Sequence, residues 1–137
     1  MSDVMRIQPF ATQLRRILVE LERNGSIFDI HRSLFWKPVP GAPYAVPDLF
    51  GRFIATPVGP SAGPQTQLSQ NIVSSWLCGG RFIELKTVQV QDEIVIPRPC
   101  IDMTDEGYNV EWSQELKVHE SFDEYLRAWV LINALHR

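Results

Sequence analysis

The order of element types between residues 52 and 88 constrains the fold of this 137-residue chain more than any other feature. Residues 52–58 (RFIATPV) are typical of a strand, residues 59–64 (GPSAGP) of a turn, and residues 82–88 of a second strand. Between them, the apolar positions of residues 66–77 have helical spacing. Two strands joined by one crossover helix lie parallel with a right-handed connection. The sequence therefore predicts an α/β unit whose chemistry lies in the loops at the C-terminal ends of its strands.

The segments on either side of this unit carry weaker patterns. Residues 9–24 have apolar positions at helical spacing, which predicts an amphipathic helix. Residues 26–50 are interrupted by prolines and are predicted to be a loop, and residues 89–100 are compatible with a short strand. Ser121 and Glu124 have the spacing of a capping box and predict the start of a last helix.

Composition excludes several classes of function. The chain has 13 Lys and Arg against 16 Asp and Glu, so it lacks the concentrated basic charge of a nucleic-acid-binding domain. No apolar run approaches the ~20 residues of a membrane span. The first ten residues have no apolar core, so we expect no secretory signal. Cys78 and Cys100 form no disulfide framework, which favours a reducing cytoplasm.

The turn at residues 59–64 and Lys86 are the candidate functional features. Gly59 and Gly63 allow a ligand to approach the backbone, and N–H groups at the start of the following helix can bind an anion. Lys86 lies in an apolar strand, where its charge favours a nearby negative group. Two plainer alternatives stay open: the turn only links strand to helix, and the Lys86 ammonium reaches water at a strand edge.

Other titratable residues do not form a pattern that indicates a site. His31, His119 and His136 lack metal-ligand spacing, and we interpret the acidic residues between 102 and 111 as a solvated loop. Cys78 is expected to be packed as a small apolar residue at a helix end. We therefore assign no catalytic and no metal-binding residue.

Four separated phrases in this chain carry a family resemblance. They are ATPVGPSAGPQTQLSQNIV, GGRFIELKTVQ, PCIDMTDEGYNVEW and FDEYLRAW. The stretch from residue 56 to residue 88 resembles the first strand–helix–strand unit of the flavin barrel of dihydroorotate and dihydropyrimidine dehydrogenases. Over nearly the whole chain, residues 1–137, the sequence is most similar to the N-terminal region of the selenate reductase family, whose members are long flavin and iron–sulfur oxidoreductases.

This resemblance implies an FMN-binding (β/α)8 barrel and a set of cofactor contacts. Ser61, Ala62 and Gly63 would lie against the flavin through their backbone. Lys86 would reach the N1/O2 edge of the flavin, where negative charge develops on reduction. Thr87 would form a hydrogen bond nearby.

The resemblance also implies an activity and a substrate contact. Asn109 matches an asparagine that holds the planar amide ring of the substrate, because an Asn side chain offers an acceptor and two donors in one plane. The implied reaction is hydride transfer between FMN and a planar heterocycle. Iron–sulfur clusters and any other flavin would bind in parts of the family beyond this chain.

The chain is shorter than a (β/α)8 barrel, which typically needs ~250 residues. We therefore expect an N-terminal helix and loop extension, residues 1–50, followed by an incomplete barrel with its first two βα units, residues 51–137. Open strand edges would need the remainder of the barrel, another subunit or a second copy of the chain. The alternative is a non-catalytic fragment or interaction module that needs another chain to complete the barrel.

Overall fold

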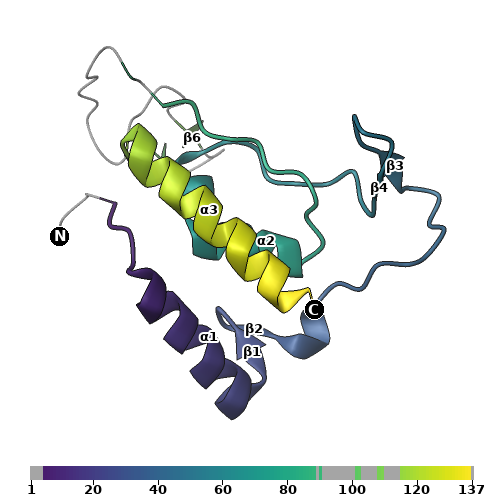
Figure 1. Ribbon diagram of the computed structural model, residues 1–137, viewed down its shortest axis with the longest axis horizontal. Helices are drawn as coiled ribbons and strands as arrows, with labels where there is room; N and C mark the ends of the chain where they lie inside the picture. Colours follow the sequence, from purple (N-terminus) through teal and green to yellow (C-terminus); the bar gives the residue numbers. More distant parts are fainter. Residues whose placement is uncertain (1–4, 89, 91–100, 103–107, 110–114, 137) are drawn as a thin grey trace.

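The computed structural model describes residues 5–88, 90, 101–102, 108–109 and 115–136 (Figure 1). Within these residues the chain is a mixed α/β structure with three α-helices, two short 3-10 helices and three short antiparallel strand pairs. The α-helices are α1 (Phe10–Asn24), α2 (Ser69–Leu77) and α3 (Val118–Leu135). The strands pair as β1 (Ser26–Ile27) with β2 (Ile30–His31), β3 (Val46–Pro47) with β4 (Phe53–Ile54), and β5 (Ile101–Asp102) with β6 (Tyr108–Asn109).

Helix α1 confirms the helix predicted at residues 9–24. It ends at Gly25, whose φ of 63° is the left-handed conformation that glycine adopts without strain. The helix buries a mixed face that includes Gln13, Ile17 and Glu20. Leu18, which belongs to the predicted apolar face, is 59% exposed. The chain folds back after α1 through a tight hairpin, β1–β2, so part of the predicted loop at residues 26–50 has regular structure.

The core lies where α2 and α3 pack together and meet α1 and the β1–β2 hairpin (Figure 1). Its buried apolar side chains are Ile17, Ile27, Val73, Leu77 and Leu131. Each element therefore contributes one or two residues to a small shared core. Such a core stabilises a domain only modestly, because the free energy gained scales with the apolar area removed from water.

Helix α3 begins earlier than the sequence indicates. The prediction placed its start at Ser121, but the first helical residue is Val118. The carboxylate of Glu120 accepts the Lys117 N–H at 2.7 Å, so this pair closes the first turn. Ser121 and Glu124 are buried on the face that packs on α2, and their side chains bind other helices instead of their own N-terminus.

The prediction of two regular strands in the α/β unit is wrong. Of residues 52–58, only Phe53–Ile54 form a strand, which pairs antiparallel with β3, and residues 82–88 lie in no strand. Pro57 and Pro60 cannot donate a backbone hydrogen bond, which prevents a continuous ladder.

The two segments nevertheless run side by side in the same direction. Three hydrogen bonds join them in matching order: Thr56 Oγ1 to Gly79 O at 2.6 Å, Arg81 N to Val58 O at 2.7 Å, and Ala62 N to Glu84 Oε2 at 2.8 Å. With α2 between them, this is the parallel strand–helix–strand path without the strand ladder. The described residues contain no closed barrel.

The helices in the described part of the chain do not meet the requirements of a membrane span. None of them combines the necessary length with sufficient apolar character. The cytoplasmic location stays a prediction.

Candidate functional site

Gly59 brings the turn of residues 59–64 against the second parallel segment. A Cβ atom on Gly59 would lie 1.9 Å from the carbonyl oxygen of Phe82, so only glycine permits this backbone approach. The Val58 carbonyl, one residue earlier, also accepts the Phe82 N–H at 3.3 Å. The turn is therefore fixed beside the segment that carries Lys86.

The three turn residues expected to contact a cofactor have different surroundings. Ser61 is exposed, Ala62 is half-buried and Gly63 is buried. The Ala62 N–H donates to the Glu84 carboxylate at 2.8 Å, and the Gly63 N–H donates to the Thr66 hydroxyl at 2.9 Å. The Ala62 N–H is thus placed to hold an anionic oxygen.

Lys86 is buried, as expected for a lysine in an apolar segment, with 5% of its surface exposed. Its backbone N–H donates to the Tyr125 hydroxyl on α3 at 3.3 Å, and its ammonium donates to the Thr87 carbonyl at 3.4 Å. Burial raises the pKa of Tyr125, although the Lys86 N–H acts in the opposite direction. Thr87 itself is exposed. Helix α3 therefore holds the backbone of the segment that carries this cation.

Glu84 lies two residues before Lys86 and connects their segment with the turn at residues 59–64. This contact brings Ala62 and the Lys86 segment into one region of the fold. Asn109 lies in β6, where it pairs with Ile101 through the backbone, and its side chain lies outside the described part of the structure. The predicted substrate contact of Asn109 stays a prediction.

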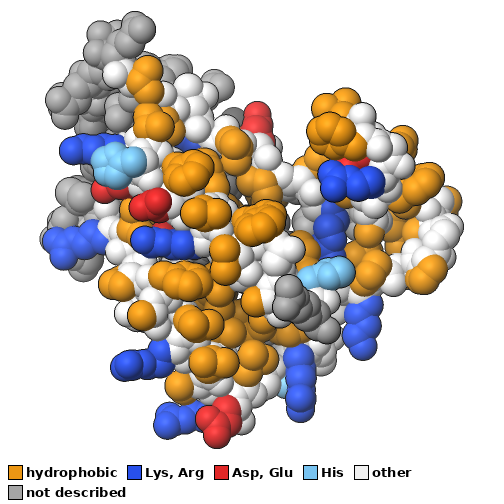
Figure 2. All heavy atoms as spheres, in the orientation of Figure 1, with side chains coloured by type: hydrophobic (Ala, Val, Ile, Leu, Met, Phe, Trp, Pro, Cys, Tyr) orange, Lys and Arg blue, Asp and Glu red, His pale blue; other side chains and the backbone are white. Residues whose placement is uncertain are grey.

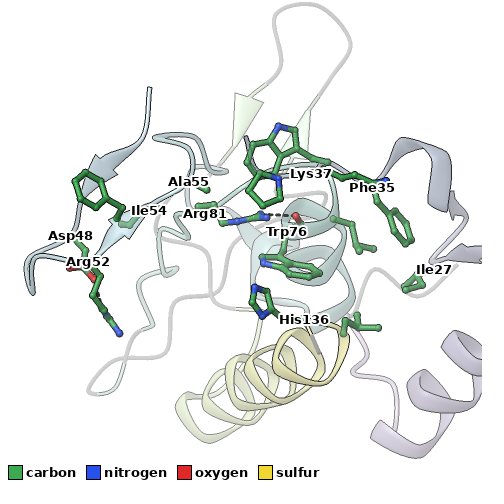
Figure 3. A pocket seen from close by; sticks show the side chains of 15 residues that line it. Ile27, Phe35, Lys37, Asp48, Arg52, Ile54, Ala55, Trp76, Arg81 and His136 are labelled. Atoms are coloured by element: carbon green, nitrogen blue, oxygen red, sulfur yellow. Dashed lines mark hydrogen bonds and ion pairs between the residues drawn. The ribbon is translucent and has the colours of Figure 1, made fainter. Parts of the chain in front are cut away.

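A second cluster, which the sequence analysis missed, surrounds Arg81. Its guanidinium carbon lies 4.9 Å from the ring centre of Trp36 and 5.1 Å from that of Trp76. Figure 3 shows Arg81 beside Trp76. Trp36 reaches this position because its backbone N–H donates to Leu77 O at 2.8 Å, and because Gly79, with φ of 104°, leaves room for the indole ring. A cavity of about 780 Å³ opens beside this cluster.

No local pattern indicates this cluster, because Trp36 lies far from Trp76 and Arg81 in the chain. Trp36 lies in the segment predicted to be a loop, and Trp76 lies in the segment predicted to be a helix. Only the folded path over the end of α2 brings both rings to Arg81. Neither the turn at residues 59–64 nor Lys86 lines this cavity.

The remaining titratable residues offer no metal centre in the described part of the chain. No three His, Cys, Asp or Glu side chains gather there. Cys78 is exposed, so the prediction that it is packed is wrong. It follows the last turn of α2, where the chain leaves the core surface. His31, His119 and His136 are exposed.

Comparison with known proteins assigns the chain to a family of oxidoreductase domains. The family model described as "Oxidoreductase YgfK, N-terminal TIM-barrel domain" matches residues 28–137. The chain therefore belongs to the family of YgfK N-terminal domains, and the resemblance drawn from the sequence is confirmed.

Two curated relatives agree with this assignment. The proteins named "Putative oxidoreductase YgfK" from Escherichia coli strain K12 and from Escherichia coli O157:H7 are each 52% identical to this chain over 135 residues. The match covers 98% of this chain but 13% of each relative. No solved structure matches the chain.

Proposed function

We propose that this domain supplies the first part of the FMN site in an oxidoreductase that transfers hydride between the flavin and a planar heterocycle. The observation that carries this proposal is the burial of Lys86 on a segment joined to the turn at residues 59–64. A buried cation on a segment that is hydrogen-bonded to the backbone N–H of Ala62 suits an anionic cofactor, because each of the two groups favours negative charge.

The turn fits the acceptor atoms of a flavin. The Ala62 N–H already holds one carboxylate oxygen, that of Glu84, which stands in for an oxygen acceptor of a ligand. Glu84 is exposed, so its side chain can turn away when a ligand takes its place. Ser61 and Gly63 would contact the flavin through the same stretch of backbone.

Lys86 would act on the charge of the cofactor. Bound FMN supplies a ring that exchanges a hydride at N5. The Lys86 ammonium would face the N1/O2 edge, where a fixed positive charge favours the reduced ring and raises its reduction potential. Tyr125 would keep the Lys86 backbone in position, and Thr87 would add a hydrogen bond beside it.

Asn109 would orient the substrate. Its carboxamide offers two donors and one acceptor in a plane, which matches the edge of a cyclic amide. Holding that edge would position the reacting carbon of the substrate, and such positioning contributes strongly to rate.

The rest of the barrel would come from the longer polypeptide or from another subunit, because the chain spans about an eighth of its relatives (13%). Figure 2 shows apolar side chains gathered on the face that carries α3. On that helix Phe122 is 62% exposed and Trp129 is 64% exposed. An exposed apolar surface of this kind marks a contact with other protein. We propose that the remaining barrel elements cover it.

A chimera tests the proposed function in a full-length protein. The 135 matched residues of this chain replace the corresponding segment of the Escherichia coli K12 relative, and FMN released from the purified protein is measured by fluorescence. We expect stoichiometric FMN in the chimera and a loss of about tenfold or more in FMN affinity for Lys86→Ala, since a buried charged contact is removed. Lys86→Arg should retain most of the affinity.

Lys117→Ala serves as the matched control, because Lys117 is exposed and the substitution keeps its backbone N–H, which donates to Glu120, and its carbonyl, which accepts the Ser121 N–H. It should bind FMN like the unchanged chimera. The proposal is wrong if the chimera and the parent relative both lack flavin, or if Lys86→Ala leaves both the FMN affinity and the flavin potential unchanged in a folded protein.

A further inference from the structure

Most N–H groups of the Arg81 guanidinium have no acceptor among the described residues. A guanidinium offers five N–H donors. Here Nη1 donates to the Trp76 and Gly80 carbonyl oxygens, both at 2.8 Å. Within the described part of the chain, Nε and Nη2 have no acceptor, and Arg81 has no carboxylate partner. Burial lowers the pKa of Arg81, as expected for a cation that has lost part of its water.

The other charges around the cavity leave it positive. Arg52 and Asp48 line it together and pair at 2.8 Å, so their charges largely cancel. Lys37 also lines it and has no carboxylate partner among the described residues. An anion is therefore the ligand that this cavity favours.

The walls of the cavity are suited to a flat molecule. The Arg81 guanidinium carbon lies over the indole rings of both Trp36 and Trp76, and these two contacts restrict the orientation of the cation. Phe35 and Phe53 add further aromatic surface. A guanidinium with a fixed plane binds a carboxylate through two parallel hydrogen bonds. The volume of about 780 Å³ lies in the range of small-molecule sites, roughly 300–1,000 Å³.

We propose that this cavity binds a small organic carboxylate with a planar apolar body, with Arg81 as the carboxylate ligand and Lys37 as a supporting charge. The site is separate from the proposed flavin site. Arg81 lies near the start of the second parallel segment, whereas the Ala62–Glu84 contact and Lys86 lie further along it. The two proposals can therefore fail independently.

The competing occupant is an acidic side chain from the remainder of the longer polypeptide. One Asp or Glu side chain could satisfy Arg81, but it would fill only a small part of a cavity of about 780 Å³. The space and the aromatic walls favour a small molecule that brings both a carboxylate and a ring.

Isothermal titration calorimetry with benzoate and benzamide tests the proposal. The two probes share a ring, but only benzoate carries a carboxylate. We expect saturable benzoate binding, with a dissociation constant of about 0.1–1 mM for so small a ligand, and at least tenfold weaker binding of benzamide. The titrations use both the 137-residue chain and the chimera described above.

Variants identify the site. Arg81→Gln should weaken benzoate binding at least tenfold, and Lys37→Gln, at an exposed position, should weaken it about threefold without affecting the fold. Lys117→Gln is the control and should change nothing. Circular dichroism of each variant shows whether the helices are intact, so Lys37→Gln decides the question if Arg81→Gln does not fold.

Three results would overturn the proposal. They are equal binding of benzoate and benzamide, no benzoate binding to the folded chain and chimera, and binding to the chain that disappears in the chimera. The last result would show that the remainder of the polypeptide fills the cavity. FMN content is measured in the same chimera variants, so loss of benzoate binding with FMN retained leaves the flavin proposal intact.

Discussion

Glu124 on α3 holds the first residue of α2, Ser69, through two hydrogen bonds to one carboxylate oxygen. Oε2 accepts the Ser69 N–H at 2.7 Å and the Ser69 hydroxyl at 2.8 Å. The other oxygen accepts Arg127 Nη1 at 2.7 Å, and the side chain of Gln13 on α1 contacts the Ser69 hydroxyl at 2.8 Å. A carboxylate at the start of a helix also complements the helix dipole. One buried network therefore joins all three helices.

Removing the Glu124 carboxylate should destabilise the fold strongly. Glu124→Ala leaves the buried Ser69 N–H without its acceptor and Arg127 without its carboxylate partner, so we expect a loss of about 3 kcal/mol in the free energy of unfolding. Urea unfolding followed by circular dichroism measures this. Asp123→Ala, at the exposed neighbouring position, should change stability by less than about 0.5 kcal/mol. Equal effects of the two substitutions would contradict the role of the network.

A side chain at position 59 should separate the two parallel segments. Gly59→Ala places a Cβ atom 1.9 Å from the Phe82 carbonyl oxygen, so the backbone must move. We expect a loss of about 2–3 kcal/mol, within the range of overpacking substitutions. Ser61→Ala, which changes an exposed side chain in the same turn, is the control and should be nearly neutral. Thermal unfolding of the two variants compares them directly, and a neutral Gly59→Ala would argue against the close approach.

The helices could be predicted because their patterns are local. Apolar spacing located α1 within one residue, and it located α2 apart from its first turn, where residues 64–67 form a 3-10 helix instead. For α3, the Ser121–Glu124 spacing was misleading, because the same residue types that cap a helix also form buried contacts between helices. Sequence alone does not reveal which partner a buried carboxylate finds.

The strands and the Arg81 cavity could not be predicted to the same degree. A strand ladder needs a neighbouring strand with free N–H and C=O groups, and Pro57 and Pro60 interrupt the supply of donors. The direction of the two segments was predicted correctly, because the connection through a single helix imposes it. The Arg81 cavity depends on Trp36 crossing the end of α2, which is a long-range contact without a local pattern.

Protonation of Glu20 should lower the free energy of unfolding at acid pH. Burial opposes ionisation of this carboxylate, but the Asp29 N–H at 2.9 Å and the Arg16 guanidinium outweigh it and hold its pKa below the usual 4.5. Because the pKa of Glu20 is lower in the folded state, its ionised carboxylate stabilises the fold at pH values above the pKa that it has in the unfolded chain. This stabilisation is lost as the pH falls through the pKa of the folded state. Urea unfolding at pH 7 and pH 3 should show this loss, and Glu20→Gln should reduce the difference between the two pH values. If Glu20→Gln retains the full difference, other carboxylates cause it.

Tyr125 should act on the proposed flavin site through Lys86. Tyr125→Phe removes the hydroxyl that accepts the Lys86 N–H at 3.3 Å, while the ring stays in place. A single hydrogen bond of this kind contributes about 1 kcal/mol, so we expect roughly fivefold weaker FMN binding in the chimera. The potential of the bound flavin should also shift downward, less than for Lys86→Ala, because the ammonium is displaced and not removed. Tyr44→Phe, at an exposed tyrosine, is the matched control. A purely structural role for Tyr125 would lower the unfolding temperature and leave the flavin potential of the folded variant unchanged.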